Sequence, residues 1–317
     1  MKAAIRTKYG LPELLKIQEV DLPTPNDNEV LVKVYATTVS RTDNHLLEGT
    51  PFIMRLFSGL FKPRLPITGT DFAGQIESTG KNVSAFKTGD NVMGFGFMGL
   101  QSHAQYITIP EDKAIITMPG NISYEEAAAC IEGAFYAHNL VENIKPVARQ
   151  NALVYGATGA IGSSTLQFLH LKGVSVTAVC NGEHSELVKS LGADRIIDYK
   201  KEDFTKDREQ YDFILDSIGR STFAKCKPLL KKKGIYSSAG GMNLLLVLIT
   251  PLLGGKKVVF APPKNLKGFL SFIKDLLEKG KFKPVIDRKY PLDKIVEAFS
   301  YVASGQKIGN VIITMDL

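Results

Sequence analysis

The feature that most constrains the fold of this chain is a glycine-rich turn that closes an apolar segment at residues 151–162. Residues 152–155 predict a buried strand, and Gly159 and Gly162 stand where a helix begins. Glycine lets an anion approach the backbone because it has no Cβ, and a helix start adds partial positive charge. The turn therefore predicts a site for the pyrophosphate of a dinucleotide. The alternative is a strand-to-helix turn that binds nothing.

The residues after this turn complete a βαβ pattern and continue it. A second apolar run begins one helix length after the turn, so the unit spans about 30 residues. Beyond residue 120, short strand signals go on alternating with helix-length connections, which is typical of a doubly wound parallel sheet. The strands of this sheet are expected at residues 152–155, 174–179, 195–197, 213–215, 235–237 and 258–260.

The first 120 residues have a different pattern. Short segments of alternating apolar and polar residues are separated by Gly and Pro, which predicts a barrel-like β domain. Ser123 and Glu126 then have the spacing of a capping box, so a helix is expected to start there. The main strands of the β domain are expected at 29–36, 73–77, 90–94 and 104–109, and the tail is expected to form a helix at 292–303 and a strand at 310–314.

Composition argues against several classes of protein. The net charge of +7 comes from 39 basic residues that are scattered along the chain, so no nucleic-acid partner is expected. Three cysteines without a C-x-x-C pair provide neither a disulfide framework nor a cysteine-rich zinc site, which fits a reducing, cytoplasmic compartment. The apolar run at 244–253 has about half the length of a membrane span. We expect no membrane insertion there; a buried helix, a subunit contact and a pocket wall are the open interpretations.

Residues 65–74 and 89–92 carry a resemblance to a known family. Their ordered proline, glycines and aspartates resemble the signature of the medium-chain dehydrogenase/reductases, and the glycine turn stands where that family has its cofactor loop. The chain is most similar to the zinc-independent, quinone oxidoreductase-like branch. The resemblance implies a GroES-like catalytic domain at 1–120 and 262–317, a Rossmann nucleotide-binding domain at 121–261, an active cleft at their junction, and a homodimer.

A catalytic zinc ion is not expected. Zinc-dependent members of the family resemble this chain but carry a Cys near position 40 and Gly-His-Glu near position 69, whereas here the residues are Ser40 and Gly69-Thr70-Asp71. The five histidines have no mutual metal-ligand spacing either. Without a Lewis acid, an alcohol loses its usual means of forming an alkoxide. The resemblance therefore implies hydride transfer from a reduced nicotinamide to a small apolar acceptor, either a quinone or the conjugated double bond of an α,β-unsaturated carbonyl.

The candidate catalytic residues are Ser40, Asp43 and His45, in a segment that resembles a motif of the family. Polar groups there would stabilise charge that develops on the acceptor oxygen. Other interpretations are open: Ser40 as a turn residue, Asp43 as a helix cap and His45 as a solvent-exposed side chain. The residues expected to line an apolar substrate pocket, with the core or a dimer seam as the alternative for each, are Phe52, Phe57, Phe95 and Phe135.

The end of the second strand bears on which nicotinamide coenzyme binds. NAD enzymes place an Asp or Glu there, but Val179 is followed by Cys180-Asn181-Gly182. The missing carboxylate leaves room for a 2′-phosphate and favours NADPH, while Glu183 would repel phosphate, so NADH is the alternative. The residues expected to bind the cofactor are Gly156, Thr158, Gly159, Ala160, Ile161, Gly162, Cys180, Asn181, Gly182, His184, Tyr199, Ser217, Gly219, Ser238 and Ala239.

Two other functions compete with an NADPH-dependent reductase. A non-enzymatic NADPH-binding regulator or adaptor would keep the cofactor loop while departing from the family at Ser40 and at Phe135, where many relatives have a Thr. An alcohol dehydrogenase-type activity would need zinc. Consumption of NADPH with quinones, alkenals or enones separates the enzyme from the adaptor, and stoichiometric zinc would favour the alcohol dehydrogenase.

Overall fold

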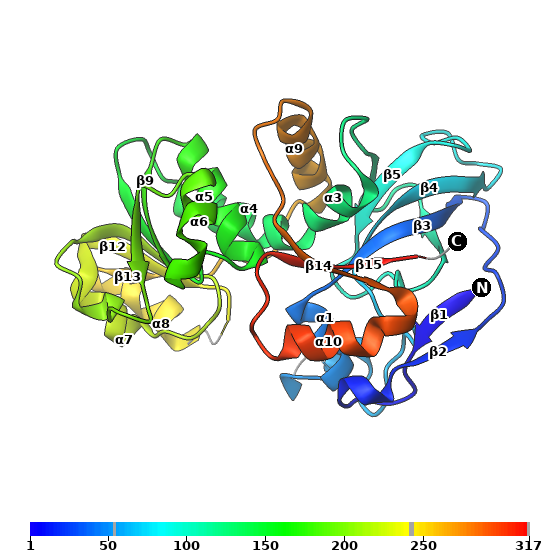
Figure 1. Ribbon diagram of the computed structural model, residues 1–317, viewed down its shortest axis with the longest axis horizontal. Coiled ribbons are helices and arrows are strands. Elements are labelled where there is room, and N and C mark those ends of the chain that lie inside the picture. The colour runs from blue at the N-terminus through cyan, green and yellow to red at the C-terminus, as the bar shows by residue number, and fades with distance from the viewer. Residues whose placement is uncertain (53–54, 241–243, 316–317) are drawn as a thin grey trace. The chain divides into compact units, whose positions relative to one another are not determined.

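The computed structural model describes residues 1–52, 55–240 and 244–315. Contacts within the chain divide it into two compact units (Figure 1). The first unit combines Met1–Glu132 with Asn265–Leu317, and the second is Gly133–Lys264. These boundaries, at residues 132 and 264, lie 12 and three residues beyond the positions 120 and 261 expected from the sequence.

A mostly antiparallel sheet, with one parallel pair of strands at its edge, organises the first unit. Its longest strand, β3, pairs along one side with β4 and along the other side with β6 and then β15. The strands of this sheet are β3 (Glu29–Val39), β4 (Asp71–Thr79), β5 (Asn91–Phe95), β6 (Tyr106–Pro110), β7 (Ile115–Thr117), β14 (Ile286–Pro291) and β15 (Asn310–Thr314). The last strand of the chain thus lies beside one of the first, which confirms the predicted return of the tail.

Apolar side chains at alternate positions of β3 form part of the core of the first unit. Val30, Val32 and Val34 point to one side of the strand and pack in a cluster with Phe299 and Val311. Helix α3 contacts β3, β4 and β15, which places residues 121–132 with this unit. The other elements of the unit are β1 (Lys2–Ile5), β2 (Lys16–Glu19), α1 (Arg41–Glu48), α2 (Arg55–Ser58), α3 (Tyr124–Ala129), α9 (Leu266–Glu278) and α10 (Ile295–Ala303).

The start of α3 has the predicted capping box. The Oγ of Ser123 accepts a hydrogen bond from the backbone N–H of Glu126 at 3.2 Å, and the Glu126 carboxylate accepts one from the backbone N–H of Ser123 at 2.9 Å. Both bonds satisfy donors that a helix start otherwise leaves open.

A six-stranded parallel sheet forms the second unit, in the order β10-β9-β8-β11-β12-β13. The first strand of this sheet in chain order, β8, is at the centre. The next two strands, β9 and β10, lie on one side of it, and β11, β12 and β13 lie on the other side. This order confirms the doubly wound sheet, whose ligands bind where the strand order reverses. Its strands are β8 (Asn151–Tyr155), β9 (Ser175–Cys180), β10 (Arg195–Asp198), β11 (Tyr211–Asp216), β12 (Leu230–Ser238) and β13 (Lys257–Val258).

Helices connect these strands. Helix α5 follows the glycine turn and contacts β8 and β9, while α7 and α8 contact β12 and β13 respectively. The helices are α4 (Glu132–Ile144), which starts at the last residue of the first unit, α5 (Ala160–Leu171), α6 (Ser185–Ser190), α7 (Phe223–Cys226) and α8 (Leu244–Ile249).

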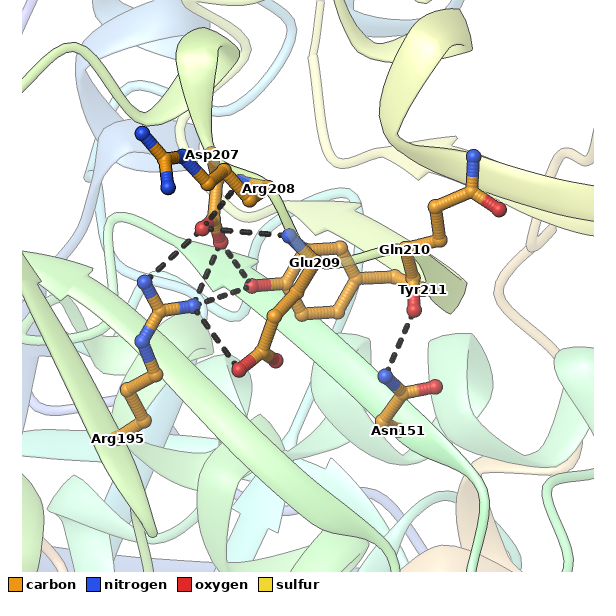
Figure 2. Close-up of polar contacts among 7 residues, drawn as sticks. All are labelled: Asn151, Arg195, Asp207, Arg208, Glu209, Gln210 and Tyr211. Atoms are coloured by element: carbon orange, nitrogen blue, oxygen red, sulfur yellow. Dashed lines mark hydrogen bonds and ion pairs between the residues drawn. The ribbon is translucent and has the colours of Figure 1, made fainter.

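A charged cluster holds the amino ends of the parallel strands. Figure 2 shows the guanidinium of Arg195, at the start of β10, against Asp207 and Tyr211. Two Arg195 nitrogens donate to the two Asp207 carboxylate oxygens at 2.7 and 2.9 Å, and the Tyr211 hydroxyl donates to the same carboxylate. Burial opposes ionisation of Asp207, but these hydrogen bonds outweigh it and lower its pKa to about 2. This cluster lies at the opposite edge of the sheet from the carboxyl ends.

The apolar run at 244–253 is exposed rather than buried. It forms α8 and a short helical turn at Thr250–Leu253, and the exposed fractions of Leu248 and Leu252 are 70% and 84%. The interpretation as a buried helix is therefore wrong, because Leu246 and Val247 pack only partly against the core below. Within the described ranges, no helix is both long and apolar enough to cross a membrane.

Candidate cofactor site and active site

Close backbone contacts hold the glycine-rich turn in shape. Gly156 has a φ of +78°, which favours glycine, and a Cβ added at Gly162 would lie 2.1 Å from the carbonyl oxygen of Gly156. Gly159 is the N-cap residue of α5, and in the described structure it provides no side-chain hydrogen bond to the helix start. The N–H groups of the first turn, at the half-buried Ala160 and Ile161, are therefore available to an external acceptor. With Thr158, these residues form a cradle that fits paired phosphates.

Asp216 shapes the neighbouring loop, and sequence reasoning missed it. It ends β11 opposite Tyr155, which ends β8, at the point where the strand order reverses. Its buried carboxylate accepts hydrogen bonds from the backbone N–H groups of Ile218 at 3.1 Å, Gly219 at 2.8 Å and Ser221 at 2.7 Å. The sequence feature that could have indicated Asp216 is a single acid at the end of an apolar strand, followed three residues later by Gly219.

The two predicted serines differ in their hydrogen bonds, because only the hydroxyl of Ser217 has no protein partner in the described structure. Its Oγ is buried and has no hydrogen-bond partner among the residues in the described ranges. Ser238 instead donates to the carbonyl oxygen of Gly240 at 2.6 Å, and the N–H of Ala239 donates to the carbonyl oxygen of Asp216 at 2.8 Å. Ser217 is therefore the better candidate donor to a ligand, while Ser238 and Ala239 shape the loop beside it.

The loop after β9 is closed by a lysine that sequence reasoning missed. The side-chain oxygen of Asn181 accepts from the N–H of Glu183 at 3.4 Å, and its amide nitrogen donates to the Glu183 carboxylate at 2.9 Å. The ammonium group of Lys200 lies 3.3 Å from the same carboxylate. The negative charge that we expected to repel a phosphate is thus countered by a cation from a segment 17 residues away.

The remaining predicted cofactor residues surround this loop. A Cβ added at Gly182 would lie 2.4 Å from a carboxylate oxygen of Asp198, so a larger residue there would displace that side chain. The thiol of Cys180 is buried, and burial raises its pKa to about 11, which keeps it protonated. Tyr199 is 53% exposed and His184 is half-buried, so both side chains are accessible to a ligand.

Ser40 and Asp43 form a capping box at the start of α1. The Asp43 N–H donates to Ser40 Oγ at 3.0 Å, and one Asp43 carboxylate oxygen, Oδ2, accepts from the N–H and the hydroxyl of Ser40 at 2.9 and 2.8 Å. The helix-cap interpretation of Asp43 is therefore confirmed, and Ser40, for which a turn was the alternative, is the N-cap residue of the same helix. His45 is exposed, with its Nδ1 3.2 Å from the Thr50 hydroxyl. A catalytic role for the three residues stays a prediction.

Three buried acids lie near this cap. Asp43, Asp71 and Glu132 are each at most 6% exposed. Burial raises the pKa of all three, to about 8 for Asp71, and the charge of Asp43 raises that of Glu132 further. Neither Asp71 nor Glu132 was a predicted site residue. For Glu132, the available signal was a glutamate inside an otherwise apolar helix start.

Of the positions at which zinc-dependent relatives carry Gly-His-Glu, Asp71 is engaged in hydrogen bonds here, whereas the buried hydroxyl of Thr70 has no partner among the described residues. Asp71 accepts from the N–H of Thr38 at 2.7 Å and from its hydroxyl at 2.6 Å. The buried His103 contacts the Thr68 hydroxyl and the Thr38 carbonyl oxygen at 2.7 and 2.8 Å, and burial lowers its pKa to about 4. In the part of the chain that is described, no three His, Cys, Asp or Glu side chains are grouped to hold a metal ion.

The four predicted pocket phenylalanines are in different environments. Phe52 is 65% exposed, whereas Phe95 in β5 and Phe135 in α4 are buried, at 1% and 2% exposed. The side chain of Phe57, in α2, lies outside the described part of the structure. The pocket role of these residues stays a prediction.

Family models match two parts of the chain. Residues 26–120 match the model described as alcohol dehydrogenase GroES-like domain, and residues 191–313 match that described as zinc-binding dehydrogenase. The chain is 33% identical to the 2-methylene-furan-3-one reductase of Solanum lycopersicum, an alignment that covers 99% of this chain and 79% of the relative. It is 31% identical to the chloroplastic quinone-oxidoreductase QR1 of Triphysaria versicolor, over 94% of this chain and 93% of the relative.

Solved structures confirm the fold. The quinone oxidoreductase of Coxiella burnetii superposes with a TM-score of 0.87 at 23% identity, over 99% of both chains. The quinone oxidoreductase of Escherichia coli, whose structure is a complex with NADPH, superposes with a TM-score of 0.81 at 21% identity, over 99% of this chain and all of that chain. Both comparisons support a GroES-like unit combined with a Rossmann-type unit.

Proposed function

We propose a reaction from one premise: this chain belongs to the medium-chain dehydrogenase/reductase family, in its quinone oxidoreductase-like branch. It transfers a hydride from NADPH to a quinone or to the conjugated double bond of an α,β-unsaturated carbonyl, without zinc. The observation that carries this proposal is the glycine cradle at residues 156–162, open to phosphate at the carboxyl ends of a doubly wound parallel sheet.

The residues of the second unit fit NADPH. The N–H groups after Gly159 would hold the pyrophosphate, and the buried hydroxyl of Ser217 would donate to the nicotinamide half. The loop after β9 carries no acid at the strand end, and Lys200 beside Glu183 supplies positive charge for a 2′-phosphate. Bound NADPH supplies the hydride. The Escherichia coli neighbour was solved as a complex with the same coenzyme.

In the first unit, the residues that would bind the acceptor and donate hydrogen bonds to it are Ser40, Asp43 and His45. Reduction leaves negative charge on the acceptor oxygen, which needs donors nearby. Asp43 keeps a proton more readily than an exposed aspartate because burial raises its pKa, so its carboxyl can act as a donor as well as a helix cap. The Ser40 hydroxyl holds this carboxyl in place. The exposed His45 would contact the outer part of the acceptor.

The acceptor class is supported by relatives and tested by turnover. The Solanum lycopersicum relative is named for a conjugated ketone and the Triphysaria versicolor relative for quinones. We expect NADPH absorbance to decrease with at least one member of a panel of quinones, alkenals and enones, and the Asp43→Asn variant to be slower. NADPH binding without consumption by any acceptor would instead support a cofactor-gated regulator or adaptor.

Independence from zinc is supported by Ser40, Thr70 and Asp71 at the positions where zinc-dependent relatives carry ligands. Ser40 is engaged in the cap of α1 and Asp71 in bonds from Thr38. We expect metal analysis of the purified protein to find far less than one zinc per chain and turnover to survive a chelator. Stoichiometric zinc, with loss of activity on its removal, would favour alcohol dehydrogenase-type chemistry.

A homodimer and a reducing compartment complete the proposal. The strand β13 is at the edge of the parallel sheet, and the exposed Leu248, Leu252 and Leu253 precede it. A second copy would cover these side chains and the open strand edge. The three free cysteines, all buried, fit a reducing compartment such as the cytoplasm, although the Triphysaria versicolor relative is named as chloroplastic. Analytical ultracentrifugation tests the dimer: Leu252→Lys should shift it to monomers.

A further inference from the structure

Two buried carboxyl groups each keep one oxygen without a protein partner. The side chains of Asp43 and Glu132 are 1% and 6% exposed, and within the described part of the chain neither Asp43 Oδ1 nor Glu132 Oε1 has a hydrogen-bond partner. An ionised carboxylate in such surroundings is unfavourable unless a charge or donor meets it. These two groups are therefore expected to hold a proton between them at neutral pH.

The hydroxyl of Ser40 bonds to Asp43 and lies near Glu132. Its oxygen accepts from the Asp43 N–H and its proton goes to Asp43 Oδ2 at 2.8 Å, which leaves a second lone pair on Oγ. Burial raises the pKa of Glu132, and the hydroxyls of Thr42 and Ser40 near its carboxyl lower this pKa less strongly. Within the described structure the hydrogen bonds of the Ser40 side chain go to Asp43, and Glu132 Oε1 has no partner. A protonated Glu132 that turned toward the second lone pair would donate to Ser40, which donates to an ionised Asp43.

The charges around the pair favour one shared proton. The acids Asp71 and Glu132 and the cations Arg6 and Lys307 face this region. Burial and the charge of Asp43 raise the pKa of Glu132, and Lys307 lowers it less strongly. Arg6 lowers the pKa of Asp43, but burial has the larger effect. Two neighbouring carboxylates that cannot both ionise easily keep one proton where a single exposed carboxyl has lost it.

We propose that Asp43 and Glu132 share one proton through the hydroxyl of Ser40 and that this pair supplies the proton that completes reduction of the acceptor. The inference rests on the proposed reductase function. Asp43 is the donor to the acceptor, and Glu132 is a positioning residue that keeps the proton on the pair. Asp43 lines a small cavity of about 10 Å³ with Arg6 and Thr68, room on the scale of one water molecule.

Reduction of the acceptor consists of a hydride transfer followed by a proton transfer. The hydride brings two electrons and forms the new bond to hydrogen on the acceptor, and the displaced electron pair leaves a negative charge on its oxygen. The O–H bond of Asp43 then breaks and the proton bonds to that oxygen, directly or through one water molecule. When the proton lies on Glu132, it first passes through Ser40 as one Oγ–H bond forms and the other breaks. The pair regains its proton from solvent.

The first test measures protonation without turnover. Infrared spectra of protein labelled with ¹³C-aspartate, recorded against pH without NADPH, follow the C=O band of protonated Asp43, which Asp43→Asn identifies by its loss. In Glu132→Gln the neighbouring charge is absent, so the Asp43 band should disappear about one pH unit or more earlier. The control Glu125→Gln alters an acid that pairs with Lys289 instead and should leave the band unchanged. An unchanged Asp43 titration in Glu132→Gln would overturn the shared proton.

The second test is the pH profile of turnover with NADPH and an accepted enone. In the wild type, kcat/KM should fall as pH rises through the range where the pair loses its proton. In Glu132→Gln this fall should begin at lower pH, with kcat reduced about 10-fold or more at pH 8, while Glu132→Asp should recover part of the loss. A purely structural role would lower the melting temperature without moving the profile, and that result would overturn the proposal.

Failure of the inference and failure of the proposed function are distinguishable. A wild-type protein that oxidises NADPH while Glu132→Gln keeps the same pH profile contradicts only the shared-proton inference. A wild-type protein that oxidises NADPH with none of the acceptors contradicts the reductase function and with it the role in proton supply. The infrared titration still decides whether Asp43 and Glu132 are coupled.

Discussion

The backbone of Gly162 lies against that of Gly156, so that a Cβ on Gly162 would come within 2.1 Å of the Gly156 carbonyl oxygen. Gly159, in the same turn, is different: its Cβ would lie 3.5 Å from that oxygen, an ordinary contact. We therefore expect Gly162→Ala to lower the free energy of unfolding by about 1–3 kcal/mol, as overpacking does, measured by urea denaturation.

The variant Gly159→Ala is the matched counterpart, because it leaves the turn intact and adds a methyl group beside the cradle. It should unfold like the wild type and bind NADPH about 10-fold more weakly by titration calorimetry, since the phosphates approach the backbone at this point. Unchanged NADPH affinity in a folded Gly159→Ala would contradict the proposed pyrophosphate site.

Lys200 is expected to contribute to the choice of coenzyme. Its ammonium group lies 3.3 Å from Glu183 in the loop after β9. The Lys200→Met variant removes a cation and leaves the acid uncountered, so NADPH should bind about three- to tenfold more weakly while NADH affinity changes little. The neighbouring Lys201→Met serves as control, because Lys201 is 80% exposed and 3.8 Å from Asp198. Equal losses for both coenzymes would place the 2′-phosphate elsewhere.

The contact of Arg195 with Asp207 should stabilise the second unit without affecting coenzyme binding. The Asp207 side chain is 5% exposed, so Arg195→Met leaves a nearly buried carboxylate with fewer donors and should lower the free energy of unfolding by about 2 kcal/mol. Because the pair lies at the amino ends of the strands, NADPH affinity should not change. Lys189→Met removes an exposed ion pair with Glu186 and should have little effect on stability.

The buried Asp71 should make stability fall as pH rises. Its folded pKa is about 8, whereas an exposed aspartate ionises near 3.9, so between these values the folded state binds the extra proton. The free energy of unfolding then decreases by up to about 1.4 kcal/mol per pH unit from this group, and its contribution is lost above about pH 8. Asp71→Asn keeps the acceptor for the Thr38 N–H and should gain stability relative to wild type between pH 5 and 8. A constant difference over that range would show that Asp71 is ionised throughout.

Strand positions were largely predictable because they depend on local pattern. The alternation in β3, the apolar runs of β8 and β9, and the capping box at Ser123 each depend on residues that are close together in the sequence. The exposed run in α8 was not predictable, because the sequence marks a segment as apolar without saying what covers it.

The sequence by itself determined the glycine-rich turn after β8, because Gly156, Gly159 and Gly162 lie within one turn and need only local backbone geometry. Only the tertiary structure decided which polar groups meet: Lys200 reaches Glu183, and Glu132 comes near Asp43 and Ser40 from 89 residues further along the chain than Asp43. The physical reason is that burial and charge depend on what surrounds a group in space. The pKa of a carboxyl that looks ordinary in the sequence is therefore raised only once the fold has removed water from it.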